Sequence, residues 1–237
     1  MSTFVLIHGA NQGGWCWYKV VALLEKQGHT VIAPDLPSHG RDKTPIAVVS
    51  LEAYVETVCR ILDAQSEPVI LVGHSMGGGI ITQAAEYRPD KIKTLVYLTA
   101  LLLRNGEAML PAFQQDMASL SLANMEIAPD QSVMTFREDA LKEAMYADCS
   151  DEDVALAKLL LVPQALTPGG TPMRTSDANF GRVPRVYIEC LCDRALTPWF
   201  QKKMYMALPC QKVISMNTSH SPFFSAPAEL AAHLAAL

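Results

Sequence analysis

The chain has 237 residues, half of them apolar and 18% charged, and its formal net charge is −5. This length and composition suit a single domain with a large buried core, and the lack of a basic excess argues against nucleic acid or an anionic membrane as partner. The longest apolar run, 94–103, is too short to span a bilayer. The N-terminus lacks the charged region of a signal peptide, so we expect a cytoplasmic protein.

In the first hundred residues, short runs of Val, Ile and Leu alternate with helical patterns. Because these runs are nearly continuous in apolar residues, they predict parallel strands that helices cover on both faces, joined by right-handed crossovers. The expected strands are 3–8, 29–34, 68–72 and 94–100. The expected helices are 15–27, one that Ser50 caps and that runs to about 65, and 76–87.

From about 101 to 181 the sequence is rich in methionine and helical in pattern, with no convincing strand, and its clearest helix is 151–161. We interpret this stretch as an inserted helical cap on one domain (1–237) whose core is 1–100 and 182–237. After it the first pattern returns, which completes a mostly parallel six-stranded sheet. The expected strands here are 185–191 and 212–216, and the expected helices are 198–208 and 227–237.

Residues 73–77 read Gly-His-Ser-Met-Gly, a G-x-S-x-G motif, and follow the apolar strand PVILV directly. The motif alone is weak evidence, but a strand before it and a helix after it are the context that a strained nucleophile turn requires. The flanking glycines give the space that a Cβ would fill. Ser75 is therefore the candidate nucleophile, and the alternative is a serine that only caps the following helix.

The loop after the first strand is expected to face Ser75, because ligands bind beyond the carboxyl ends of parallel strands. We expect the backbone N–H groups of Ala10 and Met76 to hold the oxygen of a tetrahedral intermediate. His8 is interpreted as a strand-end histidine bonded to loop backbone. The residues expected to contact the substrate are Gly9, Asn11 and His74.

His220 follows the last predicted strand in a polar loop and is the candidate general base; an ordinary solvated histidine is the alternative. Asp193 follows the preceding strand and is expected to orient His220. Asp177 is the second candidate for this role, whereas Asp35 is expected to order its own loop. Ser75, Asp193 and His220 thus occur in the order Ser…Asp…His of α/β-hydrolases.

The six cysteines are scattered, and we expect them to be reduced. Cys190 and Cys192 form a C-x-C pair, but no second pair or histidine cluster with zinc-ligand spacing is near them. We therefore predict no metal site and no cofactor.

Four stretches carry a resemblance to a known family: FVLIHGANQGGWCWYKV, VILVGHSMGG, CSDEDVALAKLLLVP and RVYIECLCDRALTPWFQ. They resemble the plant methylesterases (the salicylate-binding protein group), the related hydroxynitrile lyases and bacterial carboxylesterases. The resemblance runs nearly end to end and implies an α/β-hydrolase core with a helical cap. It also implies triad positions at Ser75, Asp193 and His220, and dimers are common in the resembled family, so a homodimer is an expectation.

The departures favour one branch of this group. The cyanogenic lyases have threonine at the position of Gly9, glutamate at that of His74 and lysine at that of Ser221, and the lysine charge is thought to hold cyanide. The sequence therefore predicts ester hydrolysis, with a hydroxynitrile lyase and a slow or non-catalytic small-molecule receptor as the alternatives.

The methionine-rich cap suggests an adaptable apolar lid, although a plain cap core explains it equally well. We expect small to medium hydrophobic esters, including methyl or aromatic esters. Carbamates, lactones and thioesters remain open, since the same machinery would cleave them.

Overall fold

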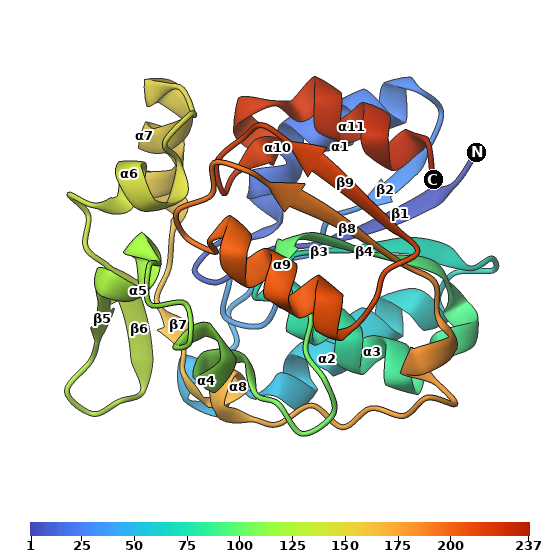
Figure 1. Cartoon of the computed structure of the whole chain (residues 1–237), viewed down its shortest axis with the longest axis horizontal. Coiled ribbons are helices and arrows are strands. Elements are labelled where there is room, and N and C mark those ends of the chain that lie inside the picture. The colour runs from blue at the N-terminus through green and yellow to red at the C-terminus, as the bar shows by residue number, and fades with distance from the viewer.

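A central parallel sheet organises the molecule, and the computed structural model describes all 237 residues (Figure 1). Its strand order is β2-β1-β3-β4-β8-β9, and every neighbouring pair is parallel. The predicted α/β fold is confirmed, and the expected mostly parallel sheet is parallel throughout. The strands are β1 (Thr3–Ile7), β2 (Thr30–Ile32), β3 (Val69–Ser75), β4 (Ile92–Ala100), β8 (Arg185–Cys190) and β9 (Lys212–Met216).

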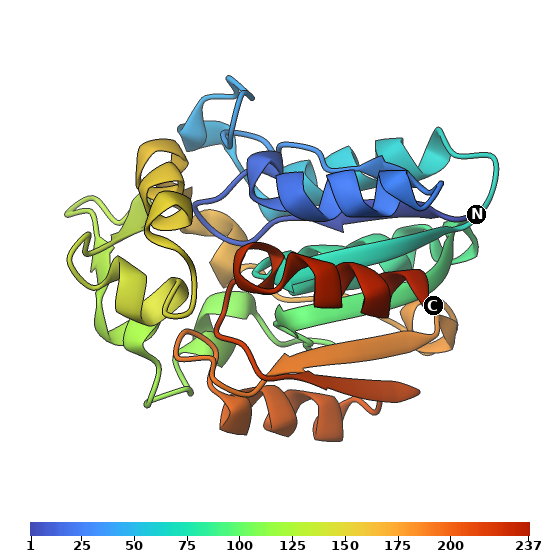
Figure 2. The same ribbon diagram turned by 90° about the horizontal axis from the view of Figure 1, so that it is seen from above.

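Helices cover both faces of this sheet, as Figures 1 and 2 show. The helices α1 (Tyr18–Lys26) and α11 (Pro227–Ala235) pack on one face. The opposite face carries α2 (Leu51–Asp63), α3 (Gly77–Tyr87) and α9 (Pro198–Ala207). The expected helix 15–27 is split, because a 3₁₀ turn at Gly14–Trp17 precedes α1.

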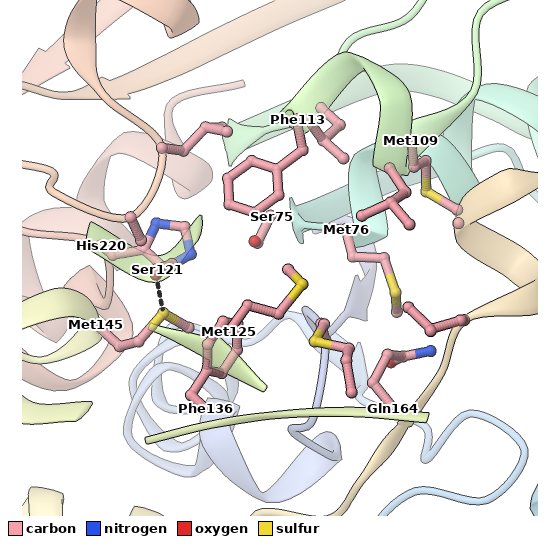
Figure 3. A pocket seen from close by; sticks show the side chains of 18 of the residues that line it. Ser75, Met76, Met109, Phe113, Ser121, Met125, Phe136, Met145, Gln164 and His220 are labelled. Atoms are coloured by element: carbon pink, nitrogen blue, oxygen red, sulfur yellow. Dashed lines mark hydrogen bonds between the residues drawn. The ribbon is translucent and has the colours of Figure 1, made fainter. Parts of the chain in front are cut away.

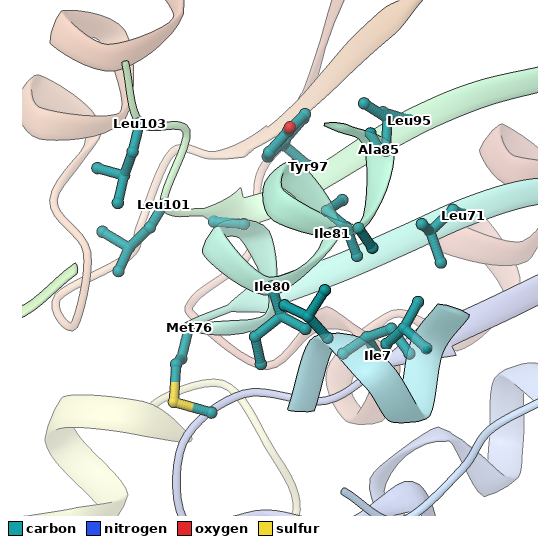
Figure 4. Packing of buried hydrophobic residues seen from close by; sticks show 14 of the residues in the cluster. Ile7, Leu71, Met76, Ile80, Ile81, Ala85, Leu95, Tyr97, Leu101 and Leu103 are labelled. Atoms are coloured by element: carbon teal, nitrogen blue, oxygen red, sulfur yellow. The ribbon is translucent and has the colours of Figure 1, made fainter. Parts of the chain in front are cut away.

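Two apolar cores result from the alternation of side chains along each buried strand. In β1, Phe4 and Leu6 belong to the core under α1 and α11, whereas Val5 and Ile7 belong to the core under α2 and α3. Figure 4 shows the second core, where Ile80 of α3 packs beside Ile7. Burial on both faces explains why the strand sequences contain few polar residues.

Helix starts follow the capping residues in the sequence. The Ser50 hydroxyl accepts a hydrogen bond from Ala53 N at 3.2 Å, which confirms the predicted cap of α2. Thr197 caps α9 in the same way, through Phe200 N, and Pro198 occupies the first helical position.

The inserted segment (residues 101–181) contains a small antiparallel sheet as well as helices. Its helices are α4 (Met109–Phe113), α5 (Leu120–Ala123), α6 (Leu141–Met145), α7 (Asp151–Leu160) and α8 (Thr167–Gly170). Its strands, in the order β5-β6-β7, are β5 (Met125–Ile127), β6 (Val133–Phe136) and β7 (Gln164–Ala165). The prediction that no strand lies here was wrong, because strands of two to four residues are too short to show a periodic pattern.

The inserted segment lies beyond the carboxyl ends of the sheet strands, at the left of Figure 1. Short elements complete the chain: 3₁₀ helices at Ile46–Val48, Pro89–Lys91 and Phe180–Arg182, and α10 (Pro222–Ser225). None of the helices combines the length and the apolar character that crossing a bilayer requires.

Candidate active site

The turn between β3 and α3 holds Ser75 in a strained conformation. Ser75 has φ +52°, in the left-handed region that non-glycine residues seldom adopt. A Cβ at Gly73 would lie 2.7 Å from Gly77 O, and a Cβ at Gly78 would lie 2.3 Å from Leu101 O. Gly73 in the motif and Gly78 directly after it therefore let β3, α3 and the end of β4 approach closely enough to form the turn.

His220 and Asp193 meet at the ends of β9 and β8. His220 Nδ1 lies 2.7 Å from Asp193 Oδ2, and both side chains are buried. An ionised carboxylate only accepts hydrogen bonds, so Nδ1 carries the imidazole proton and Nε2 is left with its lone pair. The other carboxylate oxygen, Oδ1, accepts from Ala195 N at 2.7 Å and Leu196 N at 2.9 Å. This geometry fixes the ring and its tautomer.

Ser75 and His220 line the same pocket, and Figure 3 shows the Ser75 hydroxyl inside it with the His220 ring at one side. The structure contains no hydrogen bond between Ser75 Oγ and His220 Nε2. Such contacts are often long in enzymes without substrate and shorten when the substrate is bound. Residues far apart in the sequence thus converge at the carboxyl edge of the sheet.

Ala10 and Met76 are the residues expected to supply the backbone oxyanion donors. Both residues line this pocket, and neither backbone N–H donates a hydrogen bond within the protein. Met76 also opens α3, whose N-terminal partial positive charge favours developing negative charge nearby. Each N–H group thus has no acceptor within the protein, as a donor to an oxyanion requires.

The pocket is mainly apolar: 14 of its 19 lining residues are hydrophobic. Its methionines are Met76, Met109, Met125, Met134 and Met145. Besides Ser75 and His220, its polar residues are Gln164 and Ser121, and both are already bonded. Gln164 bonds to His39 and Tyr54, and Ser121 Oγ donates to Met145 Sδ. The interpretation of the cap methionines as a pocket lid fits this placement. No Asp, Glu, Lys or Arg side chain lines the pocket.

The structure does not place the three predicted substrate contacts in this pocket. Asn11 turns its amide to the inserted segment, donating to Met134 O at 3.1 Å and to Val162 O at 2.9 Å. Gly9 packs against His74, since a Cβ at Gly9 would lie 2.9 Å from His74 Nδ1. Sequence position beside Ser75 or Ala10 was the only signal, and it does not show which way a side chain points.

His74 is buried behind His220. Its Nε2 donates to the carbonyl oxygen of His220 at 2.9 Å, and the two ring centroids are 4.6 Å apart. Burial, and then the neighbouring His220 ring, hold the pKa of His74 well below its usual range. A neutral His74 supports the His220 backbone without placing a second positive charge beside it.

The interpretations of His8 and Asp35 are confirmed. His8 Nδ1 lies 2.8 Å from Gly9 O, and Leu36 N donates to His8 Nε2 at 3.1 Å. Asp35 accepts from the backbone of its surrounding loops, through Gly14 N at 2.7 Å and Arg41 N at 3.0 Å. Asp177, the second candidate acid, is exposed and bonds to no histidine.

Sequence reasoning missed Thr99, whose hydroxyl donates to Asp193 Oδ2 at 2.5 Å. A threonine near the end of a buried strand gives no signal of this contact. No group of three or more His, Cys, Asp or Glu side chains is arranged to hold a metal ion.

The chain is similar to known proteins over nearly its whole length. A model of the alpha/beta hydrolase family matches residues 4–233. Methylesterase 1 of Arabidopsis thaliana is 36% identical over 242 residues, which cover 96% of this chain and 92% of that protein. Putative methylesterase 11, chloroplastic, of the same plant is also 36% identical, over 239 residues and 96% of this chain. The chain spans only 61% and 54% of the lengths of putative methylesterases 11 and 13.

Solved structures agree with these relatives. Tomato methylketone synthase I, in complex with 2-tridecanone, has a TM-score of 0.90 and 28% identity, over 99% of this chain and 96% of that one. A pyrethroid hydrolase from Sphingobium faniae has a TM-score of 0.85 and 31% identity, over 99% of this chain and 96% of that one.

Proposed function

The chain belongs to the alpha/beta hydrolase family, in the group of the plant methylesterases, and on this basis we propose that it hydrolyses carboxylic esters through Ser75. The observation that carries the proposal is a convergence: Ser75, His220, Ala10 and Met76 line one apolar pocket, and the backbone N–H groups of Ala10 and Met76 have no acceptor within the protein. Acyl transfer needs this set of a nucleophile, a base and oxyanion donors.

The proposed reaction proceeds by way of an acyl-enzyme. His220 Nε2 removes the proton of Ser75 Oγ, and Oγ attacks the ester carbonyl carbon. The N–H groups of Ala10 and Met76 bind the resulting oxyanion, and Asp193 stabilises the imidazolium. The alcohol leaves with the proton from His220, and water then repeats the sequence to release the acid.

The pocket supports small to medium hydrophobic esters as substrates. Its methionines adapt to substrates of different shapes. The polar side chains of Ser121 and Gln164 are already hydrogen-bonded within the protein. The names of the relatives point the same way, since they include methylesterases and a pyrethroid hydrolase. Methyl or aromatic esters are the first candidates, and carbamates, lactones and thioesters belong in the same panel.

The test is turnover of p-nitrophenyl butyrate, followed by a panel of natural methyl esters. Wild type should release p-nitrophenol, and Ser75→Ala should fold normally and lose at least ~10³-fold in kcat/KM. Retention of wild-type turnover by Ser75→Ala would reject the proposal.

Two alternatives give different results in simple assays. A hydroxynitrile lyase would release cyanide from mandelonitrile, but position 221 is a serine whose hydroxyl donates to Met145 O at 2.9 Å. A non-catalytic receptor would bind small molecules without ester turnover. A cytoplasmic location and a homodimeric state stay predictions, and several relatives are named chloroplastic.

A further inference from the structure

Thr99 occupies a bulge in β4, next to Ser75. In the pairing of β3 with β4, His74 lies opposite Leu98 and Ser75 lies opposite Ala100, so Thr99 has no partner. Its φ is +35°, which is rare for a β-branched residue. Bulges beside active sites often turn a side chain toward a new target, and strain of this kind persists where surrounding contacts enforce it.

Tyr187 of β8 fixes the bulge from the neighbouring strand. Its hydroxyl accepts from Ala100 N at 3.1 Å and donates to Ala100 O at 2.8 Å. Both backbone groups of the residue after Thr99 are thus held by one buried side chain. This clamp keeps the Thr99 backbone in its unusual conformation.

The bulge directs the Thr99 hydroxyl to the carboxylate that orients His220. Thr99 Oγ1 donates to Asp193 Oδ2 at 2.5 Å, and Asp193 is the only hydrogen-bond partner of this fully buried hydroxyl. The same Oδ2 bonds to His220 Nδ1 at 2.7 Å. Without Thr99, the ring would be the only group to hold that oxygen in place.

The four donors to Asp193 divide into two pairs. The N–H groups of Ala195 and Leu196 hold Oδ1, while Thr99 and His220 share Oδ2. No Lys or Arg bonds to this carboxylate, so neutral donors and the imidazole ring offset the cost of burying its charge.

We propose that Thr99 is a positioning residue of the triad: its hydroxyl fixes Asp193 Oδ2 at the point where it holds the His220 ring for proton transfer. This inference rests on the proposed esterase function. Thr99 does not line the pocket, so its effect should fall on the chemical step and not on substrate binding.

Three substitutions separate the hydroxyl from the strained backbone. Thr99→Val removes the hydroxyl and keeps the shape. Thr99→Gly removes the hydroxyl and also accepts the positive φ without strain, so it should fold even if Thr99→Val does not. Thr99→Ser keeps the hydroxyl. Thr82→Val is the matched control, because this buried threonine bonds to Gly78 O and Tyr97 and not to Asp193.

The test is steady-state hydrolysis of p-nitrophenyl butyrate by each variant, with thermal unfolding measured in parallel. Loss of a hydrogen bond to a charged group predicts a fall in kcat of ~10-fold to ~100-fold for Thr99→Val and Thr99→Gly, with KM within ~2-fold. Thr99→Ser should stay within ~3-fold of wild type. Thr82→Val should lower the stability and leave kcat unchanged.

Two results would overturn the inference. One is a wild-type kcat in Thr99→Gly, and the other is a loss of kcat in Thr99→Ser as large as the loss in Thr99→Val. Ser75→Ala, assayed in the same series, separates this failure from failure of the proposed function. If Ser75→Ala is inactive while Thr99→Gly is fully active, only the role of Thr99 is wrong. If Ser75→Ala is active, both proposals fall.

Discussion

Asp148 holds Ser219, the residue directly before His220. Ser219 N donates to Asp148 Oδ2 at 2.8 Å, and the Ser219 hydroxyl donates to Asp148 Oδ1. On the other side of His220, the Ser221 hydroxyl donates to Met145 O at 2.9 Å. Asp148 and Met145 belong to the inserted segment, so this segment covers the pocket and also fixes the loop that carries the proposed base.

Removing this contact should slow the reaction. Asp148→Ala deletes both acceptors of Ser219, and we expect kcat for p-nitrophenyl butyrate to fall about 10-fold, since a hydrogen bond to a charged group is worth about 1.5–3 kcal/mol and Asp148 is exposed. Asp151→Ala is the control from the same segment, because Asp151 pairs with Lys142 at the surface. That variant should stay within ~2-fold of wild type. Equal kcat in the two variants would show that the Asp148 contact is dispensable.

The turn at Ser75 should tolerate no side chain at Gly78. In Gly78→Ala the new Cβ would lie 2.3 Å from Leu101 O, a backbone atom that cannot move alone. Overpacking of this kind predicts a loss of about 3 kcal/mol and a fall in Tm of about 6–12 °C. Gly170→Ala is the control, because nothing lies within 4 Å of a Cβ there. A wild-type Tm for Gly78→Ala in calorimetry would contradict the tight approach of α3 and β4.

The pocket should select against charged acyl groups. It contains no Lys or Arg, and its methionines would remove water from a carboxylate without replacing it. We expect kcat/KM for p-nitrophenyl hemisuccinate to be at least ~100-fold lower than for p-nitrophenyl butyrate, which has a chain of similar length. Comparable values for the two esters would mean that the acyl chain lies outside this pocket.

Three buried histidines should make the fold sensitive to acid. Burial lowers the pKa of His8 to about 3 and also lowers the pKa values of His39 and His74. Below pH 6.5 the unfolded chain therefore binds protons that the folded chain excludes, so stability falls as the pH falls, and for His8 this continues to about pH 3. Each histidine contributes about 1.4 kcal/mol per pH unit in its window.

The measurement is the free energy of unfolding in urea at pH 7.0 and 5.5. Wild type should lose stability between these values, and His8→Gln should reduce that loss by about 1.4 kcal/mol. His233→Gln, at a partly exposed position on α11, is the control and should show the wild-type loss. An unchanged loss in His8→Gln would mean that His8 is protonated in the folded state.

Much of the core could be predicted because its signals are local. Val69–Val72 is a continuous apolar run, Ser50 is a cap, and the motif at Ser75 stands between a strand and a helix. Asp193 and His220 could be chosen as the other triad members because each follows directly after a predicted strand. These features depend on residues close in sequence, which pattern analysis detects.

The side-chain contacts around the candidate site could not be predicted, because they join segments that are distant in sequence. The direction of the Asn11 amide is set by Met134 and Val162, more than a hundred residues away. Thr99 reaches Asp193 only because its backbone bulges and has a positive φ. Neither contact leaves a periodic pattern or a motif in the sequence, so neither could be predicted from it.

The most direct measurement is covalent labelling with a fluorophosphonate, followed by mass spectrometry of the intact protein and its peptides. We expect one adduct per chain, located on Ser75, and loss of esterase activity in proportion to labelling. The Ser75→Ala variant, shown by thermal unfolding to be folded, should remain unlabelled. Full esterase activity in a protein that takes up no label, or an adduct on another residue that abolishes activity, would contradict Ser75 as the nucleophile.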